Sequence, residues 1–320
     1  MFTRRLGRSN IEVSALGMGC WAIGGPAWRG ERPVGWGEID DAESIRAIRR
    51  ALALGVTFFD TADLYGCGHS ERVLGRALAG MRDQVVIATK FGNVFDEQTR
   101  KISGSDASPD HIRRACDASL RRLNTDRIDL YQFHIGDYDP DQAHAVRDVL
   151  EELVAAGKIR SYGWSTDSPD RARVFADGPS CTAIQQRLNL FEGNQETLAL
   201  CEEHNLASVN RGPLAMGLLT GKFTPDSTLP ATDVRHGWNL KEGTMAERLA
   251  KLETLRAILT VDGRSLPQAA LGWIWARSPR TIPIPGFKTV KQVEENVAAA
   301  RFGPLTADHM QQIEAAIGRS

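Results

Sequence analysis

Short apolar segments alternate along the chain with longer segments in which apolar residues recur every three or four positions. The first pattern is typical of buried β-strands and the second of amphipathic helices. A hairpin over residues 3–13, turning at 7–10, comes before this alternation. The predicted strands are residues 15–18, 57–60, 85–89, 128–132, 159–164, 183–186, 207–210 and 281–284. A helix is predicted after each of them, starting near residues 40, 71, 109, 146, 169, 195, 266 and 290.

Eight strand and helix pairs without a break in composition predict a closed (β/α)8 TIM barrel, in which reactive groups lie at the carboxyl ends of the strands. The alternative is an open doubly wound sheet. That fold would carry a G-x-G-x-x-G phosphate loop after its first strand, whereas this segment reads GMGCWAIGG. We therefore expect residues 1–320 to form one barrel domain, with loop insertions at about 92–107 and 211–245 that cover a site.

The composition narrows the range of functions. Of the 320 residues, 42% are hydrophobic and 25% are charged, as in globular proteins with a sizeable core. The 39 Lys and Arg residues nearly balance the 40 Asp and Glu residues, so no overall charge would attract nucleic acid or an anionic membrane. The five scattered cysteines include no C-x-x-C pair, which argues against disulfides or a metal site. No apolar run is long enough to span a membrane and no secretory leader is visible, so a cytoplasmic location is expected.

Four polar residues follow consecutive predicted strands. Asp60 closes the second strand, Tyr65 lies in the loop after it, Lys90 closes the third and His134 follows the fourth. Because the carboxyl ends of neighbouring strands meet at one rim of a barrel, we expect these side chains to converge. Lys90 ends the apolar strand VVIATK and needs a partner for its charge, which Asp60 on the adjacent strand can provide.

These residue types suit the reduction of a carbonyl group. A phenol can deliver a proton to the carbonyl oxygen as hydride reaches the carbon, if a nearby ammonium group lowers its pKa from about 10. We expect Lys90 to supply that charge and Asp60 to keep Lys90 protonated. His134 would hold the substrate oxygen in line with Tyr65, the general acid.

Three motifs resemble the aldo-keto reductase family: FFDTADLYGCGHSERVLGRAL, VVIATKFG and RIDLYQFH. The resemblance spans essentially the whole chain. It implies a catalytic tetrad of Asp60, Tyr65, Lys90 and His134 in an enzyme that uses NADPH, with NADH the less favoured cofactor, to reduce an aldehyde or ketone or to oxidise the alcohol. The spacing of Asp60 and Tyr65 within D-T-A-x-x-Y-G-x-G-x-S-E, in register with the later lysine and histidine, makes the match specific.

The resemblance also implies a dinucleotide site. Ser165 in GWST and Gln185 at the sixth strand are expected beside the nicotinamide carboxamide. The segment GPLAMGLLTGK would hold the pyrophosphate through backbone amides. PIPGFKTVKQVEEN would hold the adenosine end, with Lys288 on the 2′-phosphate. In these two segments the implied residues are Gly212, Pro213, Leu214, Gly217, Lys222, Gly286, Lys288, Gln292, Glu295 and Asn296.

Three positions depart from the family pattern. Leu188 in QQRLNL stands where relatives usually carry a tyrosine that stacks on the nicotinamide, Thr166 where asparagine is common, and Gly212 where serine is usual. The first departure keeps open an NADPH-binding sensor or regulatory subunit with little turnover.

A second alternative is a lyase in which Lys90 forms a Schiff base. Asp60 argues against it, because a paired carboxylate raises the pKa of a lysine that would need a low one. The partner of an oxidoreductase would be a small carbonyl or alcohol, and Trp21 in a rim loop is expected to form part of its wall. Neither the identity of that substrate nor the oligomeric state is specified by these patterns.

Overall fold

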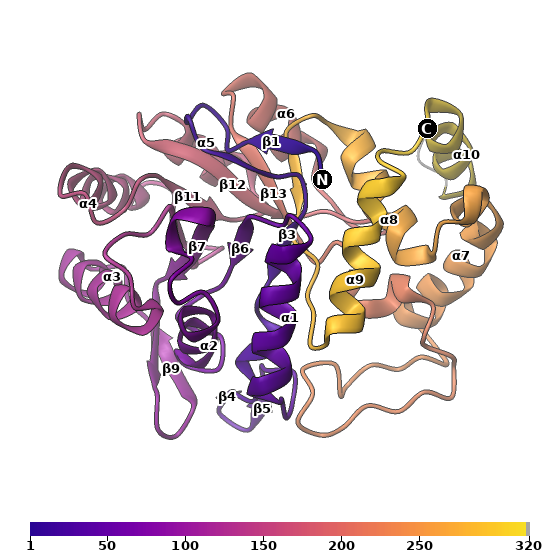
Figure 1. Cartoon of the computed structure of the whole chain (residues 1–320), viewed down its shortest axis with the longest axis horizontal. Helices are drawn as coiled ribbons and strands as arrows, with labels where there is room; N and C mark the ends of the chain where they lie inside the picture. Colours follow the sequence, from indigo (N-terminus) through magenta and orange to yellow (C-terminus); the bar gives the residue numbers. More distant parts are fainter. Residues whose placement is uncertain (318–320) are drawn as a thin grey trace.

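The computed structural model describes residues 1–317, and its centre is a parallel β-barrel (Figure 1). Each pair of neighbouring strands in it is parallel. A parallel bridge between Gly19 and Gly286 joins the last strand region to the first and closes the barrel. The predicted (β/α)8 TIM barrel is confirmed. Its eight strands are β3 (Gly17–Gly19), β6 (Phe58–Asp60), β7 (Val86–Phe91), β10 (Leu130–Phe133), β11 (Tyr162–Ser165), β12 (Cys181–Arg187), β13 (Ala207–Arg211) and β14 (Thr281–Pro283).

Helices surround the barrel, and each barrel strand is followed by one of them. The eight helices that the sequence predicts are α1 (Asp41–Ala53), α2 (His69–Ala77), α3 (Pro109–Leu123), α4 (Ala143–Ala155), α5 (Pro169–Ala176), α6 (Gln195–Glu203), α8 (Leu266–Arg277) and α9 (Val290–Ala298). Short 3₁₀ helices also occur: η1 (Ala22–Gly24), η2 (Arg82–Gln84), η3 (Ala215–Thr220), η4 (Val261–Gly263) and η5 (Ala299–Arg301).

Two helices were not predicted. α7 (Thr244–Leu259) follows the long segment after β13, and α10 (Ala307–Ile317) follows α9. The two pack against each other and against α8, at one side of the barrel (Figure 1). Both add to the eight strand and helix pairs, which is why counting pairs along the sequence did not reveal them.

Polar caps fix several helix starts. The side chains of Asp40, Ser108, Ser168 and Thr289 accept hydrogen bonds from backbone N–H groups in the first turns of α1, α3, α5 and α9. Proline follows Ser108 and Ser168 at the first helical position, where its missing N–H costs nothing. Each cap contributes about 1 kcal/mol, so these starts are encoded locally and agree with the prediction.

The predicted N-terminal hairpin is present as β1 (Thr3–Arg5) and β2 (Glu12–Ser14), which pair antiparallel. Leu6, Ile11 and Val13 join a buried cluster made of side chains from the barrel strands. The hairpin therefore covers one end of the barrel with apolar side chains. In Figure 1 it lies at the end opposite to the loop strands β4 and β5, described next.

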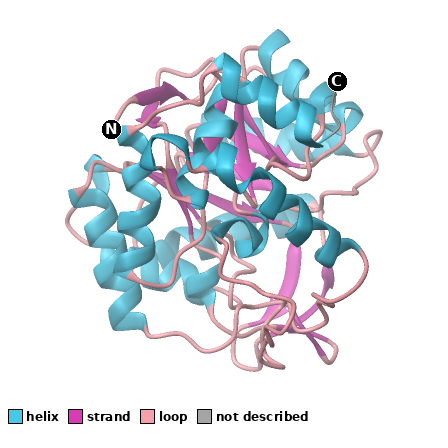
Figure 2. Ribbon diagram, turned by 90° about the vertical axis from the view of Figure 1, so that its right-hand side faces the viewer, coloured by secondary structure: helices cyan, strands magenta, loops and turns pink. Residues whose placement is uncertain are grey.

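The expected loop insertion at 92–107 is a β-hairpin, made of β8 (Asn93–Asp96) and β9 (Lys101–Ser105). It joins β4 (Trp28–Arg29) and β5 (Arg32–Pro33) from the first βα loop in a four-stranded sheet. Figure 2 shows these strands beyond the barrel, away from the N-terminal hairpin. The sequence did not indicate them because they are short and because β4 and β9 pair across a large separation in the chain.

All five cysteines are buried and free. None of the helices within residues 1–317 combines the length and the apolar character needed to cross a membrane. The same residues contain no cluster of three or more His, Cys, Asp or Glu side chains that could hold a metal ion.

Candidate active site

Asp60, Tyr65, Lys90 and His134 come together at the carboxyl end of the barrel. The ammonium Nζ of Lys90 donates to Asp60 Oδ1 at 2.5 Å, to the backbone oxygen of Thr61 at 2.8 Å and to the Tyr65 hydroxyl at 3.1 Å. The rings of Tyr65 and His134 lie edge to face, with 6.0 Å between their centroids. The four side chains that the sequence singled out therefore form one cluster.

Neighbouring strands and one tight turn place these groups. Asp60 ends β6, Lys90 lies on the adjacent β7, and the backbone N–H of His134 donates to the oxygen of Phe91 at the end of β7. Tyr65 lies in the turn before α2, where Gly66 has a φ of +60°. A Cβ at Gly66 would lie 1.8 Å from the oxygen of Gly24, so only glycine lets the turn pack against the first βα loop.

A buried network holds Asp60 in place. Its Oδ2 accepts a hydrogen bond from Gln132 Nε2 at 3.0 Å and another from Gln185 Nε2 at 2.8 Å. Gln185 Nε2 also donates to Gln132 Oε1 at 3.1 Å. Both carboxylate oxygens of Asp60 are thus occupied. Our sequence reasoning missed Gln132, although a glutamine inside the apolar segment LYQF was a signal that it needs a buried partner.

Burial and charge set the protonation states. Burial favours a neutral Lys90, but the negative charge of Asp60 and the hydrogen bonds to Asp60 and Tyr65 outweigh it and raise the pKa of Lys90. Burial, aided by the positive charges of Lys90 and Arg211, lowers the pKa of His134 well below its ordinary value, so its ring is neutral. For Tyr65, burial raises the pKa by more than Lys90 lowers it. The expectation that the phenol has a pKa below 10 is therefore wrong, because stabilising a buried phenolate requires more than one paired ammonium.

The cluster opens onto a cavity of about 1570 Å³, which Asp60, Tyr65 and His134 line. Lys90 lies beneath its floor and is fully buried. The residues that the sequence predicted for dinucleotide and substrate all line the same cavity: Trp21, Ser165, Gln185, Gly212, Pro213, Leu214, Gly217, Lys222, Gly286, Lys288, Gln292, Glu295 and Asn296.

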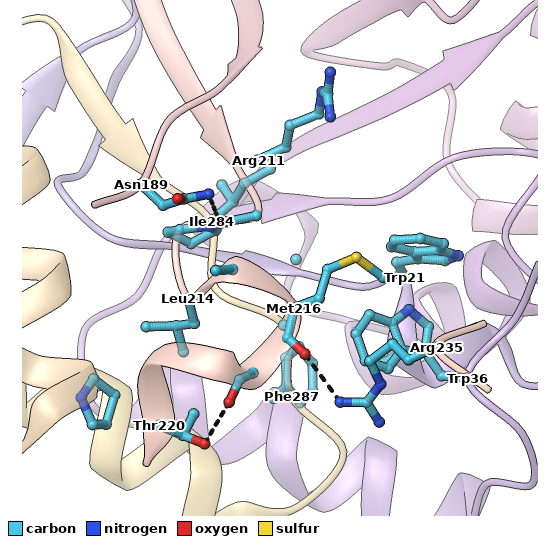
Figure 3. Close-up of a pocket in the computed structure, with 18 of the residues that line it drawn as sticks. Trp21, Trp36, Asn189, Arg211, Leu214, Met216, Thr220, Arg235, Ile284 and Phe287 are labelled. Carbon is cyan, nitrogen blue, oxygen red and sulfur yellow. Dashed lines mark hydrogen bonds between the residues drawn. The ribbon is translucent and has the colours of Figure 1, made fainter. Parts of the chain in front are cut away.

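The segment after β13 forms a cationic cradle in this cavity (Figure 3). Ala215, Met216 and Gly217 have φ values of +47°, +54° and +93°. A Cβ at Gly217 would lie 3.3 Å from Arg235 Nη1 and 3.5 Å from Lys222 Nζ, so the two cations flank its backbone. The N–H groups of Ala215 and Gly217 donate to the oxygens of Gly212 and Leu214 within this turn, so the neighbouring cations are the groups that offer an anion a partner. For the two residues that are not glycine this left-handed conformation costs of the order of 1 kcal/mol each.

Trp36 and Arg235 are among the residues of this cavity that were not predicted. The Arg235 guanidinium carbon lies 4.5 Å from the centre of the Trp36 ring, and that ring packs edge to face against Trp21 at 5.3 Å. Trp21 in turn stacks on Tyr65 at 6.0 Å. Within the described part of the chain, the buried Nε1 of Trp36 has no hydrogen-bond partner. Figure 3 shows Trp21, Trp36 and Arg235 on one side of the cavity, brought there by loops whose shape the sequence pattern does not reveal.

The far end of the cavity lies at the start of α9. Lys288 Nζ donates to the backbone oxygen of Trp36 at 2.5 Å, and the Lys288 N–H donates to Gln292 Oε1 at 2.7 Å. Glu295 accepts a hydrogen bond from the Ser265 hydroxyl. Burial lowers the pKa of Lys288, and the charge of Arg235 adds to the effect.

The structure corrects the interpretation of Leu188. This side chain is only 3% exposed, packs in the main hydrophobic core and is not among the residues that line the cavity. Arg211, at the end of β13, lines the cavity instead (Figure 3). Leu188 lies just after β12, where its side chain packs in the core shared with the surrounding helices and its backbone forms a bridge with Gly193. Thr166, the second departure, donates its hydroxyl to the oxygen of Gly136 at 3.0 Å.

A closed (β/α)8 barrel with a Lys–Asp pair, a tyrosine and a neutral histidine at the mouth of one long cavity is the arrangement of a barrel oxidoreductase. The comparison with protein families agrees, since the model of the aldo/keto reductase family matches residues 15–317. The chain belongs to this family, whose members use nicotinamide cofactors, and it is an oxidoreductase. The resemblance seen in the motifs is confirmed.

Individual relatives cover almost the entire chain. It is 35% identical over 295 residues to the aldo-keto reductase YhdN of Bacillus subtilis (strain 168), which spans 89% of this chain and 85% of that protein. It is 32% identical over 316 residues to the NADH-specific methylglyoxal reductase of Escherichia coli (strain K12), with 95% and 94% covered. The solved structure of the glycerol dehydrogenase AKR11B4 from Gluconobacter oxydans matches with a TM-score of 0.85 and 33% identity, covering 99% of this chain and 95% of that one.

Proposed function

We propose that this protein is an NADPH-dependent reductase of small aldehydes or ketones, with Tyr65 as the general acid, and that it oxidises the corresponding alcohols in reverse. The observation that carries the proposal is the contact of Lys90 Nζ with both Asp60 and the Tyr65 hydroxyl at the floor of one cavity. This contact supports the proposal, because a phenol beside an ammonium group at the floor of a cavity could give its proton to a substrate while the ammonium stabilises the phenolate.

The dinucleotide, when bound, supplies a hydride to the carbonyl carbon. Tyr65, protonated at neutral pH, gives its phenolic proton to the carbonyl oxygen, so that hydride and proton together convert the carbonyl into an alcohol. Lys90 stabilises the phenolate that remains, and Asp60 keeps Lys90 charged. His134, which is neutral, can donate a ring N–H to the substrate oxygen and orient it toward Tyr65.

The residues around the cavity fit a dinucleotide. Gln185 donates its Nε2 to Asp60, so its Oε1 remains free to accept a hydrogen bond from the carboxamide of a nicotinamide, beside Ser165. Burial lowers the pKa of Lys222, and the charges of Arg235 and Lys288 add to this effect, whereas Asp233, the ion-pair partner of Arg235, opposes it. A pyrophosphate beside Gly217 would give an anionic partner to Lys222 and Lys288, which have no ion pair within residues 1–317, whereas Arg235 is already paired with Asp233.

The preference for NADPH rests on Lys288. Its ammonium group is half-buried and donates to two backbone oxygens, those of Trp36 and Glu38. No carboxylate within residues 1–317 is hydrogen-bonded to it, although the charge of Asp233 acts on it at longer range. A 2′-phosphate would supply a directly bonded negative charge. The methylglyoxal reductase of E. coli is NADH-specific by name, so the preference of this chain has to be measured.

Steady-state oxidation of NADPH, followed by absorbance with a panel of aldehydes and ketones, tests the proposed reaction. We expect turnover with at least one carbonyl compound, and no trapped adduct on Lys90 after borohydride treatment, because its ion pair keeps the amine protonated. Tight dinucleotide binding without turnover would instead identify a sensor. A borohydride-trapped adduct would identify a Schiff-base lyase.

A further inference from the structure

Arg211 lines the cavity but belongs neither to the tetrad nor to the cationic cradle after β13. It lies at the end of β13, immediately before Gly212, and its side chain is about one-third exposed. Asp167, in the loop after β11, accepts a hydrogen bond from its guanidinium group. The same aspartate accepts the backbone N–H of Arg187 at 2.6 Å, so Asp167 is itself held in place.

The surroundings of Arg211 carry a positive balance. Arg187 and Arg248 both pair with Glu192, at 3.2 Å and 2.9 Å, as Arg211 pairs with Asp167. Three guanidinium groups against two carboxylates leave one positive charge at this rim. Further inside, the Lys90–Asp60 pair is neutral as a unit and His134 is uncharged. The charge of Arg211 is thus offset by Asp167, and the tetrad residues of the described chain add no net charge that would offset it further.

The field of Arg211 reaches the reacting groups. Its positive charge opposes the rise in the pKa of Tyr65 and contributes to the low pKa of His134. A carbonyl held by those two residues must receive hydride from a nicotinamide ring in contact with it. Arg211 lines the same cavity as Ser165 and Gln185, so a nicotinamide ring bound beside these residues would lie near its charge.

We propose that Arg211 makes the site discriminate between the two redox states of the nicotinamide, favouring the neutral reduced ring over the cationic oxidised ring. The inference rests on the proposed function, because it requires that this cavity binds the dinucleotide. A fixed cation repels the positive charge that the ring acquires when it gives up hydride, whereas it has no such effect on the dihydro form. Arg211 thereby promotes departure of the oxidised product after reduction.

The size of the effect follows from Coulomb's law. Two unit charges about 6 Å apart, at an effective dielectric constant of about 20, interact by an energy equivalent to a roughly hundredfold change in an equilibrium constant. The negative charge of Asp167 offsets most of this. We therefore expect Arg211 to change the ratio of the dissociation constants of oxidised and reduced dinucleotide by about fivefold to tenfold.

Isothermal titration of the purified full-length protein with NADP⁺ and NADPH, in the absence of substrate, measures that ratio directly. Arg211→Gln should lower the preference for NADPH by about fivefold to tenfold, and Arg211→Lys, which keeps the charge, should retain most of it. Asp167→Asn should shift the ratio in the opposite direction, because it exposes the charge of Arg211. Arg173→Gln, an exposed arginine of α5 outside the cavity, is the matched control and should leave the ratio unchanged.

The NAD⁺ and NADH pair should show the same change, since the effect concerns the ring and not the 2′-phosphate. The inference is overturned when Arg211→Gln weakens both redox states equally. It is also overturned when that variant leaves both dissociation constants unchanged and only raises the KM for anionic carbonyl substrates, which would make Arg211 a substrate ligand. A wild-type protein that binds no dinucleotide would refute the proposed function itself, which separates the two failures.

Discussion

Replacing Tyr65 by phenylalanine removes the proposed proton donor and little else. The only hydrogen bond of the phenol that the structure records comes from Lys90, which keeps its bonds to Asp60 Oδ1 and to the oxygen of Thr61. The ammonium group is therefore not left without partners. We expect the free energy of unfolding to fall by no more than about 1 kcal/mol, the typical contribution of one such hydrogen bond.

The effect on catalysis should be much larger. A positioned general acid contributes a factor of about 10² to 10⁴ to the rate, or roughly 3 to 5 kcal/mol of transition-state stabilisation. Single-turnover oxidation of bound NADPH by an aldehyde substrate reports this step without product release. Calorimetric titration with NADPH should give a dissociation constant close to that of the wild type, because the lost hydroxyl contacts Lys90 and not the phosphate cradle.

Tyr138→Phe is a matched control, since the Tyr138 hydroxyl lies outside the cavity and bonds Gln142. It should keep the wild-type rate. Full activity in Tyr65→Phe would refute the role of the phenol. A loss of dinucleotide binding that accounts for the whole loss of rate would show that Tyr65 holds the cofactor.

Three further changes test separate parts of the structure. Lys288→Ala should weaken the binding of NADPH about tenfold or more and that of NADH little, because a charge-assisted contact with the 2′-phosphate is lost. Equal losses of affinity for both dinucleotides would contradict this, and so would the same result for the exposed Lys251→Ala. The pKa of His134 is lowered on folding, so as the pH falls below about 6.5 the unfolded chain binds its proton first and the free energy of unfolding declines. His134→Gln should flatten that decline, measured by urea titration at several pH values. An unchanged dependence of stability on pH would disprove it. Glu71→Gln should lower the free energy of unfolding by about 3 kcal/mol in the same assay, because the nearly buried guanidinium of Arg122 loses the carboxylate that lies 2.6 Å from it. A loss below about 1 kcal/mol would mean that Glu97, the second partner of Arg122, is sufficient.

Much of the fold could be predicted because the signals for it are local. The strand ending at Asp60 and the helix starts at Ser108 and Ser168 depend on short apolar runs and caps that act within a few residues. The convergence of Lys90 and His134 followed from the barrel, since parallel neighbours end at one rim. For the same reason the tetrad was predictable once the strands were placed.

What could not be predicted depends on contacts between distant loops. Trp36 and Arg235 meet over a large separation in sequence, and neither belongs to a periodic pattern. Leu188 was misinterpreted because the sequence does not show that it packs in the core while Arg211, at the end of another strand, lines the cavity. The direction of the Tyr65 pKa was misjudged because the sequence shows which charges are near but not how deeply the phenol is buried.

The hydrogen bond from Gln185 to Asp60 has a consequence for how activity is acquired. It joins β12 to β6, which three other strands separate in the sheet, so it spans the inside of the barrel. A partly assembled barrel lacks it, and so does one with a slipped strand. Recovery of the catalytic rate during refolding should thus lag behind the return of helical circular dichroism, because the site is complete only when the barrel has closed.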